Sequence, residues 1–232
     1  MILLPIRDDA PRSTPPLVNY FLILLNIAVF LLERFWGIQR AVDLHFGFVP
    51  RHVNLWLNGR LPLEAVLIPL FSSMFLHVTV WHLISNMWFL AIFGDNVEDR
   101  LGHFQYLIFY LITGLAANIT HYFFNFNSNI PSVGASGAIA GIMGAYFTLF
   151  PTARVLTLAV IFFPIWLPAW LLLGYWFVLE LLNGTATALL STRQPAGGVA
   201  FWAHIGGFVA GVVLIKIMPA RTRYFAYDYG SP

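Results

Sequence analysis

Six long apolar stretches limit what this chain can fold into more than any other feature of its sequence. A bilayer core of about 30 Å takes roughly 20 residues of helix to cross, and a helix satisfies its own backbone polar groups there. Only 9% of the 232 residues are charged and 59% are hydrophobic, whereas a soluble domain carries about 25% charged residues. The sequence therefore predicts an all-α polytopic membrane protein with six transmembrane helices. The stretches run from about 17 to 32, 81 to 97, 104 to 123, 136 to 150, 155 to 182 and 200 to 218.

The arginine and lysine residues predict how these helices are oriented. In a six-span arrangement, seven of the 12 basic residues lie on the side that carries both termini. The excess of positive charge marks the cytoplasmic side, so we expect both termini to be cytosolic. Residues 1–16 are then a short N-terminal arm, 17–218 the six-span domain and 219–232 a cytosolic tail. Residues 35–80 form a long external loop, whose composition suits short amphipathic pieces lying in the interface.

Several chemistries are excluded by composition. The chain has no cysteine, which removes disulfides and thiolate metal sites, and it has no HExxH motif for zinc. Asp95 lies at a helix end and Asp228 in the tail, so no pair of buried aspartates is expected. The net charge is only +2 and the basic residues are scattered, which argues against nucleic-acid binding. We expect no metal and no cofactor.

Three polar side chains are expected at one depth in the membrane. Ser136 begins the fourth stretch and His204 lies near the start of the sixth, each roughly 20 Å from the cytosolic end of its helix at 1.5 Å per residue. His82, in the second stretch, comes out only slightly lower. The fourth stretch is too short to reach the outer surface, and irregular backbone at that depth is tolerated where it lines a water-filled cavity.

These residues fit the chemistry of a serine hydrolase. A neutral histidine is the usual base for a serine hydroxyl, so His204 is the candidate base and Ser136 the candidate nucleophile. The free N–H groups at a helix start favour developing negative charge, so the backbone at Ser136 can help to hold an oxyanion. His82 and Asn86 are four residues apart on one helix face and can donate to the same oxygen. Glu180 is the one acidic residue in the outer half of a span; we expect a Ser–His dyad and not a triad.

Small residues around the two candidates predict close helix packing. Gly137 and Gly141 are spaced four apart, and Gly207 and Gly211 repeat that spacing, which lets two helices approach closely in lipid. With Gly134, they are the glycines expected to pack around the dyad. The alternative is that packing alone explains the run GASGAIAG. His77 and His121 are interpreted first as hydrogen-bonded structural groups.

Three motifs together resemble the rhomboid family of intramembrane serine proteases. They are FLHVTVWHLISNM at 75–87, SVGASGAIAG at 132–141 and AHIGGFVAG at 203–211, and they occur in the family's order. The resemblance implies a six-helix rhomboid core, with the nucleophile at Ser136 and its base at His204. It also implies an oxyanion hole formed by His82, Asn86 and the backbone N–H of Ser136.

The chain also departs from the family pattern. A tyrosine on which the base stacks in some members is Ala140 here, so the resemblance does not tell how His204 is oriented. The Trp-Arg pair that some members carry in the first external loop is absent. The family's substrates are single-span membrane proteins, which are thought to reach the site past the fifth helix, under a mobile cap. Residues 183–198 are the candidate cap.

The sequence thus predicts a rhomboid-type protease whose partners are transmembrane protein substrates and the lipid bilayer. Its small size suits the plasma or inner membrane of a cell. A catalytically inactive relative that binds transmembrane clients is the alternative, although such relatives typically lack Ser136 or His204. A small channel or transporter is a further alternative, but the sequence shows no clear paired charges or broken helices facing a pore.

Overall fold

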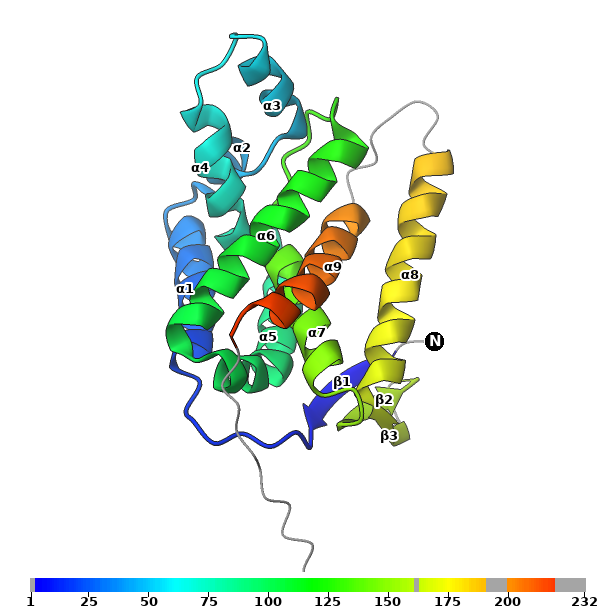
Figure 1. Ribbon diagram of the computed structural model, residues 1–232. Coiled ribbons are helices and arrows are strands. Elements are labelled where there is room, and N and C mark those ends of the chain that lie inside the picture. The colour runs from blue at the N-terminus through cyan, green and yellow to red at the C-terminus, as the bar shows by residue number, and fades with distance from the viewer. Residues whose placement is uncertain (1–2, 161–162, 191–199, 220–232) are drawn as a thin grey trace, which may run out of the picture.

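Figure 1 shows a helical bundle capped at one end by short helices and at the other by a small β-sheet. The computed structural model describes residues 3–160, 163–190 and 200–219. The long helices are α1 (Leu17–Phe35), α5 (Val80–Leu101), α6 (His103–Asn125), α7 (Ser136–Leu149), α8 (Ala169–Leu190) and α9 (Phe201–Ile217). Five of the six predicted stretches therefore correspond to helices at nearly the expected bounds.

The ends of the helices follow from local sequence and from neighbours. α1 begins after Pro15 and Pro16, and the buried carboxylate of Glu98 accepts hydrogen bonds from the backbone N–H groups of Val18 and Asn19, at 2.9 and 2.7 Å. These are free donors of the first turn of α1, which has no side-chain cap of its own. A residue from α5 thus fixes where α1 starts.

α7 is the centre of the bundle. Every residue from Gly137 to Tyr146 is buried, and α7 packs against α5, α6 and α9. In contrast, large apolar side chains on the outer faces are exposed, such as Leu24 on α1 (65%) and Leu182 on α8 (61%). Apolar outer faces are what a lipid environment stabilises.

Among the described residues, three helices, α1, α6 and α8, are each long and apolar enough to cross a membrane. A fourth span is reached when Glu64–Phe75 and Val80–Leu101, which meet at a bend of 77°, count as one. Helices α7 and α9 are apolar but shorter. The structure therefore supports three or four membrane spans, and the six-span arrangement stays a prediction.

The prediction for the fifth stretch is wrong at its start. Residues 155–168 are not helical but belong to two strands, β2 (Arg154–Ala159) and β3 (Phe163–Pro168), and α8 begins only at Ala169. Pro164 and Pro168, expected to break this helix, lie in β3, where proline is tolerated at a sheet edge. The N-terminal arm forms β1 (Leu3–Asp8), which pairs antiparallel with β2 to give a sheet of order β1-β2-β3. Because of this sheet, the expectation of an all-α protein is wrong, although the chain is mostly helical.

The long loop after α1 folds into short helices. They are α2 (Gln39–Phe46), α3 (Pro50–Leu57), α4 (Glu64–Ser72) and the 3-10 turn η1 (Ser73–Phe75). A bridge between Phe48 and Ser132 joins this loop to the segment that precedes α7. The predicted cap falls partly on α8, which is helical to Leu190, while 191–199 lies outside the described residues, as does 220–232 of the predicted tail.

Candidate active site

Ser136 and His204 meet in the structure although 68 residues separate them. Ser136 is the first residue of α7, where the backbone N–H groups of the first turn have no helical partner. His204 lies in the first turn of α9. The Nε2 atom of His204 is 2.8 Å from the Oγ atom of Ser136, which is hydrogen-bond distance. Both side chains are half-buried.

Glycines bring α7 and α9 close enough for this contact. A Cβ atom on Gly207 would overlap the carbonyl oxygen of Gly137, and one on Gly211 would overlap that of Gly141. The two predicted glycine pairs therefore face each other, as the four-residue spacing indicated. Gly144, which is not a member of the two predicted pairs, packs in the same way against the backbone of Phe208.

Gly134 has a different role from the one expected. It precedes α7 and has a φ of +137°, a conformation that glycine adopts without strain. A Cβ atom there would lie 2.8 Å from the ring of His82, so the missing side chain makes room for that imidazole beside Ser136. Gly134 shapes the approach to the site and does not pack one helix against another.

The candidate oxyanion residues share a cavity with the Ser136–His204 pair. A cavity of about 680 Å³ is lined by His82, Asn86, Ser136 and His204, together with residues of the segment before α7. The start of α5 is set by Thr79, whose side chain accepts a hydrogen bond of 3.1 Å from the His82 backbone. The four predicted residues thus converge on one space from α5, α7 and α9.

Asn86 is held by a histidine that was interpreted as structural. The Nδ2 atom of Asn86 lies 2.9 Å from Nε2 of the buried His77, so one of the two N–H groups of this amide donates to the imidazole. His121 forms a hydrogen bond of 3.3 Å with Asn125, which agrees with its structural interpretation. Nothing in the sequence predicts the contact of His77 with Asn86, except that both residues lie in one motif.

An acidic partner of His204 is present, contrary to expectation. The Nδ1 atom of His204 is 2.8 Å from Oε2 of Glu180, which α8 carries into the bundle. Trp176, one turn earlier on α8, places its ring centroid 6.0 Å from that of His204. The orientation of His204, left open by Ala140, is therefore determined by two side chains of α8.

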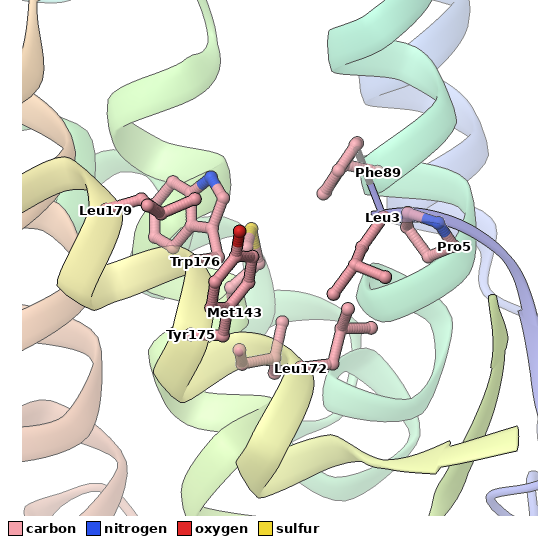
Figure 2. A pocket seen from close by; sticks show the side chains of 9 residues that line it. Leu3, Pro5, Phe89, Met143, Leu172, Tyr175, Trp176 and Leu179 are labelled. Carbon is pink, nitrogen blue, oxygen red and sulfur yellow. The ribbon is translucent and has the colours of Figure 1, made fainter. Parts of the chain in front are cut away.

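An apolar pocket adjoins the site. Figure 2 shows it between α5 and α8, with Leu3 and Pro5 of β1 on one side. Its volume is about 280 Å³. Phe89, Met143 and Trp176 line both this pocket and the space around Ser136 and His204, so the two spaces are neighbours. In the part of the chain that the structure describes, no group of three or more histidine, aspartate or glutamate side chains is placed to hold a metal ion.

Comparison with protein families agrees with this geometry. The family model of the rhomboid domain matches residues 64–221, which is more than half of the chain and includes all four site residues. The chain belongs to the rhomboid family. The resemblance to the rhomboid family that the three motifs carry is thereby confirmed.

Individual rhomboid relatives are named for organelles. The presenilin-associated rhomboid-like protein, mitochondrial, of Homo sapiens is 27% identical over 199 residues, 82% of this chain and 45% of that protein. Rhomboid protein 1, mitochondrial, of Saccharomyces cerevisiae is 27% identical over 87% of this chain and 53% of its own length. Rhomboid-like protein 11, chloroplastic, of Arabidopsis thaliana is 24% identical over 86% of this chain and 64% of its own length.

Two facts follow from these relatives. The matched region spans about half the length of the mitochondrial proteins, 45% and 53% of them. The expected location in the plasma or inner membrane of a cell is wrong on this comparison, because relatives named mitochondrial and chloroplastic point to an organellar membrane.

Proposed function

We propose that this rhomboid is an intramembrane serine endopeptidase that cleaves peptide bonds in or next to transmembrane segments of membrane proteins. The observation that carries the proposal is the hydrogen bond of 2.8 Å between Ser136 and His204 on the wall of a cavity. A serine hydroxyl is a weak nucleophile until a base within hydrogen-bond reach accepts its proton. The imidazole of His204 at hydrogen-bond distance from the hydroxyl supports this role.

In the first step, Oγ of Ser136 attacks the carbonyl carbon of the scissile bond while Nε2 of His204 accepts the hydroxyl proton. The tetrahedral intermediate collapses when His204 returns this proton to the leaving amine, and an acyl-enzyme on Ser136 remains. Water, deprotonated by His204, then attacks the ester carbonyl. The second tetrahedral intermediate breaks its bond to Oγ, His204 returns the proton to Oγ of Ser136, and the acid product is released. The reaction needs neither a metal nor a cofactor.

Negative charge on the substrate oxygen is stabilised by donors that are already in place. The N–H of Ser136 points from the start of α7, where the helix dipole adds positive potential. Asn86 has a second N–H group besides the one that faces His77, and both Asn86 and His82 line the cavity beside Ser136. Removing one such donor typically costs about 10²- to 10³-fold in kcat, so these groups supply a large part of the rate enhancement.

The depth of the site explains how water and substrate meet. In this proposal all six long helices cross the membrane, and 17–218 is the protease domain. The 14 residues of α7 cover only about 21 Å, so Ser136 lies below one membrane surface. The cavity beside it gives water access to that level. The transmembrane substrate approaches from the bilayer between α5 and α8, where the apolar pocket accepts side chains next to the scissile bond.

Cleavage of a single-span test substrate by the purified chain in detergent tests this function. Ser136→Ala should abolish cleavage and labelling by a fluorophosphonate, whereas Ser132→Ala, which changes another serine on the wall of the same cavity, should retain both. Equal cleavage by wild type and Ser136→Ala contradicts the proposal. Binding of the substrate by the wild type without any cleavage or labelling would instead identify an inactive rhomboid that binds transmembrane clients.

A further inference from the structure

Glu180 and Ser136 contact opposite nitrogens of the same imidazole. Oε2 of Glu180 is 2.8 Å from Nδ1 of His204, and Oγ of Ser136 is 2.8 Å from Nε2. The side chains of Glu180 and His204 are each only 12% exposed, so both are largely shielded from solvent. A carboxylate, an imidazole and a hydroxyl therefore form one continuous hydrogen-bonded line.

This arrangement determines which nitrogen of His204 carries the proton. A neutral imidazole has one donor and one acceptor nitrogen, and an ionised carboxylate can only accept. Glu180 therefore selects the form of His204 with the proton on Nδ1. That form leaves the lone pair of Nε2 directed at the hydroxyl of Ser136, which is what a base for this serine requires.

The carboxylate also has an electrostatic effect during the reaction. When Nε2 accepts the proton of Ser136, His204 becomes a cation in a site of low dielectric constant. An anion at hydrogen-bond distance stabilises that cation. In the described part of the chain, His82 on α5 and His121 on α6 also interact electrostatically with His204, but an imidazole does not provide negative charge.

The position of Glu180 is otherwise hard to explain. Glu180 is buried in the middle of α8, a helix apolar enough to span a membrane, and ionisable groups there are costly. Among the described residues, no arginine or lysine forms an ion pair with it, and its carboxylate is hydrogen-bonded to His204. Trp176, four residues earlier and hence on the same face of α8, also contacts the His204 ring. The face of α8 that carries Trp176 and Glu180 therefore packs against the imidazole of His204.

We propose that Glu180 is a positioning residue that holds His204 in the tautomer and orientation required for proton transfer from Ser136, which makes the site a Ser–His–Glu triad. The inference rests on the proposed protease function. It assigns to α8 a chemical role as well as a role in bounding the path of the substrate.

Glu180→Gln and Glu180→Asp test the proposal, with Glu64→Gln as the control because Glu64 is exposed in the first loop. Gln can also donate to Nδ1, so it permits the wrong tautomer, and a comparable change in a soluble triad costs about 10⁴-fold in kcat. We expect Glu180→Gln to lose at least about 10²-fold in kcat and in the rate of fluorophosphonate labelling, with KM within about twofold of wild type. Glu180→Asp should regain part of the loss, and Glu64→Gln should behave as wild type.

Nitrogen-15 NMR of histidine-labelled wild type is the second measurement, and it does not depend on how the Glu180 variants fold. His204, assigned by comparison with a His204→Gln sample, should carry its proton on Nδ1. A proton on Nε2 would overturn the proposal. A folded Glu180→Gln variant with the kcat and labelling rate of wild type would also overturn it. The same holds if Glu180→Asp does not restore any of the lost activity and if the loss is accompanied by a rise in KM and a fall in thermal stability.

These outcomes are separate from those for the proposed function. If wild type and Ser136→Ala cleave equally, the protease assignment fails whatever Glu180 does. If wild type is labelled and active but Glu180→Gln equals it, only the role of Glu180 fails.

Discussion

Replacing Gly207 with alanine tests whether the close approach of α7 and α9 creates the site. The added Cβ atom would overlap the carbonyl oxygen of Gly137, and both partners are helix backbone that cannot move aside like a flexible side chain. Overpacking of this kind costs about 1–3 kcal/mol in stability. For a chain of 150–250 residues each kcal/mol shifts Tm by about 2–4 °C, so we expect Tm to fall by about 2–12 °C.

Activity should fall as well as stability. Gly207 lies one turn after His204, and Gly137 directly follows Ser136, so a separation of the two helices at this point lengthens the hydrogen bond of 2.8 Å. A misplacement of about 1 Å typically costs about 10²-fold in rate. Cleavage and fluorophosphonate labelling should both fall by that order at a temperature where the variant is still folded.

The matched control is Gly174→Ala on α8. The nearest heavy atom to a Cβ atom there is 3.9 Å away, in the ring of Phe147, which is ordinary contact distance. Alanine in a helix interior is about 0.5–1 kcal/mol better than glycine, so this variant should be unchanged or slightly more stable and fully active. Thermal unfolding in detergent and labelling of Ser136 measure both variants. A Gly207→Ala variant with wild-type Tm and labelling, or equal losses in both variants, would refute the packing argument.

Three further predictions concern separate parts of the molecule. Asn86→Ala should lower kcat by about 10²-fold through loss of an oxyanion donor, and Tm should also fall because buried His77 loses its hydrogen-bond partner. An unchanged kcat in steady-state assays would remove Asn86 from the oxyanion hole. Burial raises the pKa of Asp8 to about 6, although a hydrogen bond from the Tyr146 hydroxyl opposes the shift, so the stability contributed by the protonated acid is lost as pH rises through about 6. The Tm of wild type relative to Asp8→Asn should therefore fall as the pH rises from the ordinary pKa of 3.8 to about 6 and stay level at higher pH, and a difference independent of pH would contradict the buried position of Asp8. Leu172→Trp should fill the apolar pocket and raise KM for a transmembrane substrate by about tenfold, while labelling of Ser136 stays within about twofold of wild type. Leu171→Trp, on the exposed face of α8, should leave KM and labelling unchanged. Equal KM values for the two variants would exclude the pocket from substrate binding.

Most of the helices could be predicted from the sequence because each is a local pattern. The start of α7 at Ser136 and the facing of its glycines with those of α9 follow from helix length and from a spacing of four. The segment 154–168 could not be assigned in this way. A short apolar run is compatible with a strand or a buried helix, and its pairing with β1, about 150 residues earlier in the chain, cannot be read locally.

The contact between Glu180 and His204 also lay beyond local reasoning. The sequence places Glu180 on an apolar helix but does not determine how α8 is rotated about its axis relative to α9. Successive side chains on a helix point about 100° apart, so a rotation of α8 by that angle would turn Glu180 from His204 towards the lipid. Packing of Trp176 and Glu180 around the imidazole selects one rotation, and so the acidic partner was identified only from the structure.

The sequence by itself determined the membrane class, the order of the apolar helices, and the serine and histidine that face each other. These depend on composition, helix length and residue spacing, which are properties of continuous segments. Only the tertiary structure decided that the N-terminal arm and the start of the fifth stretch form a sheet, that His77 holds Asn86, and that Glu180 orients His204. Each of these depends on which faces of separate elements meet. That choice is made by packing over the whole bundle.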